Sequence, residues 1–154
     1  MKIWITWHRE ITFHSKLKIK EKIFNFLDNF IKEKNIYLSL IEFNLGGANW
    51  VDNWIWEYCL QNNIKYNLYL PFKNINLQIK DWTSKQKILY KKILNSNLVN
   101  SIYYWKGYFD RNRKIVDNSD IIITVFNWNY HSWTWYTLNY AKKQNKPIIN
   151  ILKK

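Results

Sequence analysis

Short apolar segments alternate with amphipathic segments along almost the whole chain, and this alternation limits the fold more than any other feature of the sequence. Six segments are rich in the β-branched and aromatic residues that favour strands: 2–6, 36–45, 64–70, 98–104, 120–126 and 147–152. Five segments between them carry helical spacing or helix-start signals: 16–34, 51–62, 85–94, 108–118 and 134–144. Because the strand segments are mostly apolar instead of alternating with polar residues, they are typical of a parallel sheet with both faces covered. The sequence therefore predicts an α/β fold, a Rossmann-like three-layer sandwich with a mostly parallel sheet of about five or six strands.

The length and charge of the chain narrow the prediction further. Its 154 residues fit one domain, 1–154, and no repeat or linker interrupts it. Lys and Arg number 24 against 11 Asp and Glu, which gives a formal net charge of +13. We favour a solvated basic surface, because Lys, Asn, Ile, Tyr and Phe are all abundant, as an AT-rich coding sequence produces. A nucleotide or polyanionic partner remains the alternative.

The composition excludes several kinds of site. With Cys59 as its single cysteine, the chain can form no internal disulfide and no thiolate zinc site. The histidines, His8, His14 and His131, have no spacing that resembles a metal site, so no metal is predicted. No apolar run approaches the ~20 residues of a membrane span, and the N-terminus lacks a signal-peptide pattern. We expect a cytoplasmic protein without a membrane partner.

The counts of glycine and tryptophan are both unusual. Glycine occurs 3 times, whereas average usage gives roughly 11 in such a chain, and tryptophan occurs 10 times. Their sum of 13 is ordinary for a domain of this size. One interpretation is a tryptophan-rich protein. The other is that tryptophan stands where the native protein has glycine, as when a reassigned stop codon that means glycine is translated as tryptophan.

The positions of the tryptophans favour the second interpretation. In open α/β sheets, ligands bind outside the carboxyl ends of the strands, at loops that lead into helices. Such loops need glycine, because backbone amides approach the ligand and some residues adopt a positive φ. Among the candidate loops, 6–9, 46–52 and 127–134, only the second contains glycine. We therefore predict that four tryptophans of these loops are glycines in the native protein: Trp7, Trp50, Trp128 and Trp133.

Five segments, in order along the chain, carry a family resemblance. They are TWHR at 6–9, GGANWVDNWIWE at 46–57, LPF at 70–72, YFDRNRKIVDNSDII at 108–122 and WTWYTLNYA at 133–141. With these motifs the chain resembles the YpsA-like branch of the SLOG superfamily, whose Rossmann-type nucleotide-binding domains include DprA and the LOG phosphoribohydrolases. The departures fall mainly on glycine positions of the family pattern. They include Trp7, Trp50 and Trp133.

The resemblance implies a nucleotide-derived ligand bound by residues of these motifs: Thr6, Arg9, Gly46, Gly47, Asp52, Glu57, Arg111, Asn112 and Thr134. A guanidinium fork suits a phosphate, and a threonine at a helix start can donate to one. Structural roles remain open for several of them. Arg111 and Glu57 could lie on exposed helix faces, Asp52 could be a helix N-terminal charge, and Thr134 could be an N-cap.

Three functions follow from the resemblance and the charge. The first is a module that senses or sequesters an NAD-like or ADP-ribose-like ligand. The second is hydrolysis of a nucleotide N-glycosidic bond, with Glu57 or Asp52 as general acid or base and Arg111 on the phosphate. The absence of glutamate from 132–139, where phosphoribohydrolases carry one, weakens that alternative. The third is binding of single-stranded nucleic acid. The ligand's identity and the oligomeric state, a homo-oligomer included, stay open.

Overall fold

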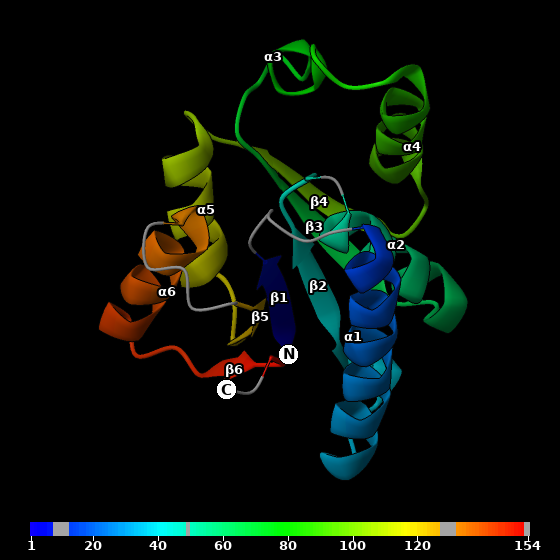
Figure 1. Ribbon diagram of the computed structural model, residues 1–154, viewed down its shortest axis with the longest axis vertical. Coiled ribbons are helices and arrows are strands. Elements are labelled where there is room, and N and C mark those ends of the chain that lie inside the picture. The colour runs from blue at the N-terminus through cyan, green and yellow to red at the C-terminus, as the bar shows by residue number, and fades with distance from the viewer. Residues whose placement is uncertain (8–12, 49, 127–131, 153–154) are drawn as a thin grey trace.

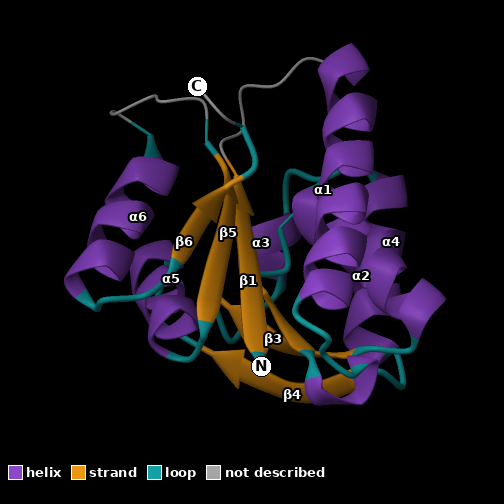
Figure 2. Ribbon diagram, turned by 90° about the horizontal axis from the view of Figure 1, so that it is seen from below, coloured by secondary structure: helices purple, strands orange, loops and turns teal. Residues whose placement is uncertain are grey.

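The computed structural model describes residues 1–7, 13–48, 50–126 and 132–152, and it contains one parallel sheet between two helical layers (Figures 1 and 2). Six strands make up the sheet: β1 (Lys2–Trp7), β2 (Glu42–Leu45), β3 (Lys65–Leu70), β4 (Val99–Tyr104), β5 (Ile121–Val125) and β6 (Ile148–Asn150). Their order is β4-β3-β2-β1-β5-β6, and every neighbouring pair is parallel. The predicted α/β, Rossmann-like three-layer architecture is confirmed.

The helices divide between the two faces of this sheet. The first face carries α1 (Phe13–Glu33), α2 (Val51–Asn62) and α4 (Ser84–Asn95), and the second carries α5 (Tyr108–Asp117) and α6 (Trp133–Lys143). A short helix, α3 (Asn76–Ile79), lies in the excursion between β3 and α4. No helix in the described ranges is long and apolar enough to cross a membrane.

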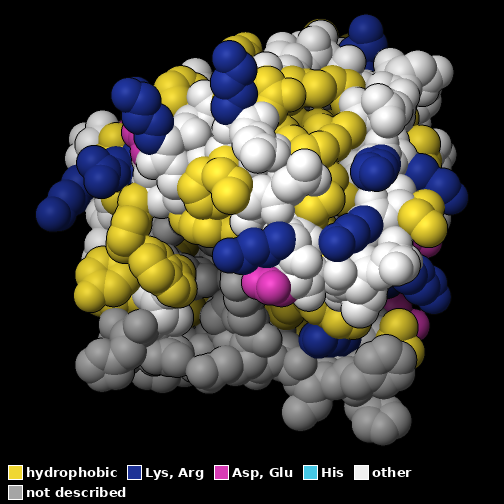
Figure 3. All heavy atoms as spheres, turned by 90° about the horizontal axis from the view of Figure 1, so that it is seen from above, with side chains coloured by type: hydrophobic (Ala, Val, Ile, Leu, Met, Phe, Trp, Pro, Cys, Tyr) yellow, Lys and Arg dark blue, Asp and Glu magenta, His cyan; other side chains and the backbone are white. Residues whose placement is uncertain are grey.

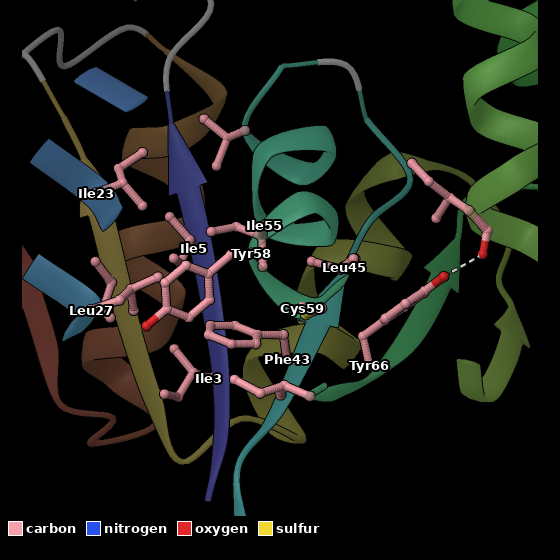
Figure 4. Packing of buried hydrophobic residues seen from close by; sticks show 14 of the residues in the cluster. Ile3, Ile5, Ile23, Leu27, Phe43, Leu45, Ile55, Tyr58, Cys59 and Tyr66 are labelled. Carbon is pink, nitrogen blue, oxygen red and sulfur yellow. Dashed lines mark hydrogen bonds between the residues drawn. The ribbon is translucent and has the colours of Figure 1, made fainter. Parts of the chain in front are cut away.

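Strand side chains of alternate residues build a core on each face. On the first face Ile5 of β1 and Phe43 of β2 pack with Leu27 of α1 and Ile55 of α2, as Figure 4 shows. On the second face Trp4, Ile122 and Phe126 pack against α5 and α6. Burial on both faces explains why the strand segments read as nearly continuous apolar runs.

The largest difference from the sequence prediction lies in segment 36–45. The structure places a 3-10 helix, Leu38–Leu40, before β2, so the strand begins only at Glu42. Tyr37 is 76% exposed and Leu40 is 61% exposed, which shows that their side chains do not reach the core. The apolar composition of the segment therefore overstated the length of the strand.

The strand order determines where a ligand site can lie. From β1 the chain builds outward through β2 and β3 to β4, and it then returns across the second face to place β5 on the other side of β1. The direction of winding therefore reverses between β1 and β5. Binding sites of doubly wound sheets lie at the carboxyl ends of the strands near such a reversal.

Candidate functional site

A cavity of about 90 Å³ lies at the carboxyl ends of the strands. It lies between the ends of β1 and β2 and the first turns of α2 and α6. It collects six of the nine predicted ligand residues: Thr6, Gly46, Asp52, Arg111, Asn112 and Thr134. These residues come from four separate parts of the sequence, and the fold brings them to one place.

Arg111 is the buried cation of the cavity. Its side chain is 5% exposed, so Arg111 does not lie on an exposed helix face as the alternative interpretation supposed. Its guanidinium donates hydrogen bonds to the carbonyl oxygens of Gly46 and Tyr69, and its Nε donates to Oδ1 of Asn112 at 2.7 Å. Arg111 thus connects α5 to the loop after β2 while its charge borders the cavity.

Asp52 is the buried anion beside it. Its Oδ2 accepts a hydrogen bond of 2.8 Å from the backbone amide of Ala48, and the residue is 6% exposed. Burial raises the pKa of Asp52 to about 6, although the Ala48 amide and the Arg111 charge act in the opposite direction. Asp52 is therefore a carboxyl group that changes its protonation state close to neutral pH.

An Asp52→Asn variant should change how stability depends on pH. Because the pKa of Asp52 is higher in the folded protein than its ordinary 3.8, the contribution of this group to stability is complete below about pH 4 and is lost as pH rises through about 6. Asparagine keeps an oxygen for the Ala48 amide but does not ionise. We therefore expect the melting temperature of the variant, relative to that of the parent chain, to increase between about pH 4 and 6. Parallel melting profiles from pH 4 to 8 would contradict this assignment.

Thr134 and Asn112 join the two helices of the second face to the cavity. The Thr134 hydroxyl donates to the Trp7 carbonyl oxygen at 2.8 Å. The N-cap of α6 is Ser132, whose Oγ accepts from the Trp135 amide, so the capping role considered for Thr134 is wrong. Asn112 donates to the hydroxyl of Thr137 at 3.4 Å. Thr137 also borders the cavity and was not among the predicted ligand residues, although it follows Thr134 by one helical turn.

Two of the predicted ligand residues in the described ranges do not line the cavity. Glu57 lies on α2 and forms a salt bridge with Lys20 of α1, with 2.6 Å between its Oε2 and the Lys20 Nζ. Gly47 adopts a φ of 70° and accepts a hydrogen bond from Gln78 through its carbonyl oxygen. Arg9 lies outside the described residues.

The structure describes three of the four tryptophans at which glycine is predicted in the native protein. Trp50 has φ 68° and ψ −93°, and the other non-glycine residues with positive φ in the described ranges are all asparagines: Asn35, Asn63 and Asn145. Trp7 and Trp133 line the cavity without a positive φ. Trp128 lies outside the described residues. At about 90 Å³ the cavity is smaller than the ~300 to 1,000 Å³ of typical ligand pockets, and both tryptophans are among the residues that line it.

Lys and Arg side chains are spread across the face in Figure 3, with hydrophobic and neutral polar groups between them. Among the described residues, no group of three His, Cys, Asp or Glu side chains could hold a metal ion.

The chain is similar to a protein encoded by a bacterial prophage. No family model matches the chain. The uncharacterized SPbeta prophage-derived protein YoqJ of Bacillus subtilis (strain 168) is 30% identical to it over 148 residues, and the match covers 82% of each protein.

Proposed function

The chain belongs to the same family as the prophage-derived protein YoqJ of Bacillus subtilis, and we propose that it binds a nucleotide-derived ligand of the NAD or ADP-ribose type in the cavity at the carboxyl ends of its central strands. In this proposal the protein is a cytoplasmic binding module of the YpsA-like branch of the SLOG superfamily. It senses or sequesters its ligand.

One observation carries the proposal: the residues implied by the family motifs converge. Gly46, Arg111 and Thr134 are far apart in sequence, yet all three border one cavity at the strand ends. Arg111 supplies a buried positive charge, and α2 and α6 both begin beside the cavity. Helix N-termini and guanidinium groups both favour a phosphate. A phosphate-bearing ligand therefore suits this end of the sheet.

An N-glycosidic hydrolase is the second candidate, and Asp52 is the observation that favours it. General acid–base catalysis is most efficient when the pKa of the catalytic group lies near the working pH, and the pKa of Asp52 is about 6. Glu57 is a weaker candidate because it pairs with Lys20 on the first face of the sheet. Release of free base from NAD or a nucleoside monophosphate, with loss of that activity in Asp52→Asn, would select hydrolysis over binding alone.

A thermal-shift screen tests the binding proposal. We would use NAD, ADP-ribose, ADP and AMP on the chain as written and on a variant that combines W7G, W50G and W133G. The variant should bind more strongly, because two of these tryptophans line the cavity and glycine would leave more room there. A ligand at 100 times its Kd adds about 2.7 kcal/mol to the free energy of unfolding, which a melting curve resolves.

The controls distinguish specific ligand binding from non-specific electrostatic binding. Adenosine lacks phosphate and should shift the melting temperature little. Failure of every phosphate-bearing compound to stabilise the glycine variant would contradict the proposal. A single-stranded oligonucleotide that binds both forms, with an affinity falling steeply with salt, would instead favour nucleic-acid binding.

A further inference from the structure

The loop after β2 is held by buried side chains from three different helices. Arg111 of α5 donates to the carbonyl oxygen of Gly46, and Asp52 of α2 accepts from the amide of Ala48. Between these contacts, Gln78 of α3 donates from Nε2 to the carbonyl oxygen of Gly47 at 3.0 Å. Arg111 and Asp52 border the cavity, whereas Gln78 stands behind the loop.

Gln78 is itself fixed by a second buried residue. The Tyr90 hydroxyl, from α4, donates to Oε1 of Gln78 at 2.9 Å. Gln78 is 7% exposed and Tyr90 is 2% exposed. This pair fixes the direction of the Gln78 amide, because the oxygen accepts from Tyr90 while the nitrogen donates to Gly47.

The loop packs so closely on Tyr90 that Gly47 must be glycine. A Cβ atom on Gly47 would lie 2.9 Å from Cδ2 of Leu70 and 3.0 Å from the Tyr90 ring. The φ of 70° at Gly47 also disfavours any other residue. The excursion that contains α3 and α4 therefore forms the rear wall of the loop.

The contacts of Gln78 and Asp52 act on the same peptide unit. The carbonyl of Gly47 and the amide of Ala48 belong to one planar group, whose C=O and N–H point in opposite directions. Gln78 binds the carbonyl on one side, and Asp52 accepts from the amide on the other. Rotation of this peptide would break both hydrogen bonds.

We propose that Gln78 and Tyr90 are positioning residues, which lock the Gly47–Ala48 peptide so that its amide stays directed at Asp52 in the cavity. Their effect on ligand affinity rests on the proposed function. Their effect on the loop does not, because it concerns hydrogen bonds within the chain. The α3–α4 excursion, which contributes no residue to the cavity wall, thereby acquires a role in the site.

Gln78→Met tests the proposal, because methionine keeps a similar length and loses both hydrogen-bonding groups. We expect the Ala48 amide to exchange with solvent about tenfold faster, as for the loss of one buried hydrogen bond. We also expect the titration of the Asp52 carboxyl, followed by NMR, to move to higher pH, since the Ala48 amide lowers the pKa of Asp52. Arg111, the charge facing Asp52, is unchanged in this variant.

Matched variants distinguish the hydrogen bond from Gln78 to Gly47 from the one that Gln78 accepts from Tyr90. Gln78→Glu keeps an acceptor for Tyr90, and as a carboxylate it loses the donor to Gly47 and adds a negative charge, so it should raise the Ala48 exchange rate as Gln78→Met does. Tyr90→Phe is a milder change that keeps the ring. It should raise the Ala48 exchange rate and the Asp52 titration midpoint by smaller amounts. Gln61→Met replaces an exposed glutamine on α2 and should change neither measurement.

Two outcomes would overturn the proposal. One is an Ala48 exchange rate and an Asp52 midpoint in Gln78→Met that match those of Gln61→Met. The other is an equal rise of exchange in the loop and in β5, which would show a general loss of stability. Binding of ADP-ribose supplies a separate result: if the parent chain and its glycine variant bind no probe, the proposed function fails while the exchange data still decide the role of Gln78.

Discussion

An Arg111→Met variant is expected to lose about 1 to 3 kcal/mol of the free energy of unfolding, the range for leaving buried polar groups without their hydrogen-bond partner. Arg111 is 5% exposed and donates to the carbonyl oxygens of Gly46 and Tyr69. Without the guanidinium, these carbonyls lose a donor. Asp52 also loses the charge that favours its ionised form. Urea denaturation at neutral pH measures the loss as a lower midpoint with an unchanged slope.

Two further variants separate the charge effect from a general effect of the substitution. Arg113→Met removes an exposed arginine from the same helix and should change stability by no more than about 0.5 kcal/mol. Adding Asp52→Asn to Arg111→Met should recover part of the loss, because the buried carboxylate then no longer needs a partner. A coupling of about 0.5 to 3 kcal/mol is expected between residues in one such network. Equal losses in Arg111→Met and Arg113→Met would refute a specific role for the buried Arg111 guanidinium.

The sheet could be predicted from the sequence because each strand is covered on both faces. The segment 120–126 shows this most clearly: β5 is fully buried, and no polar alternation was needed to recognise it. The start of α4 was also predictable, since Thr83 and Gln86 exchange the two hydrogen bonds of a capping box. In these two elements the local sequence signals and the tertiary burial indicate the same secondary structure.

Other features depend on tertiary contacts that no local pattern contains. Helix α3 has four residues, too few to show helical periodicity, and so Gln78 had no signal in the sequence. Glu57 belongs to the same motif as Asp52, but it lies on a part of α2 that faces Lys20. The family motif located the loop after β2, whereas only the fold shows which side chains hold it.

Trp50→Gly is expected to be more stable than Trp50→Ala by about 1 to 3 kcal/mol, the cost of a sparsely populated backbone conformation in a residue with a side chain. At φ 68° and ψ −93°, Trp50 lies near the strained form of the γ-turn. Elsewhere in a helix or strand, glycine is usually about 0.5 to 1 kcal/mol worse than alanine. The sign of the difference is therefore the diagnostic result.

The comparison with alanine is needed because the indole also makes favourable contacts. The Lys16 ammonium lies 3.5 Å from the centre of the Trp50 ring, and the ring meets that of Trp54 edge to face at 6.5 Å. Both variants lose these contacts equally. The difference between their free energies of unfolding therefore depends only on the backbone conformation at position 50. Asn63→Gly is a positive control, since Asn63 has a φ of 53° at the end of α2. Trp50→Ala as stable as Trp50→Gly would contradict the strain argument.

The three described positions give different physical reasons for the same prediction about the native residue. Trp50 has a positive φ, which favours glycine, whereas Trp7 and Trp133 line the cavity, where a smaller residue would leave more room. A misread glycine codon explains both, and it also explains why glycine is scarce while the sum of glycine and tryptophan is ordinary. Mass spectrometry of the protein from its native cells tests this directly, because peptides with glycine at these positions, and at Trp128, are lighter by one indole-methylene group each. Native peptides that carry tryptophan at all four positions would refute it, and the small cavity would then be a property of the functional protein.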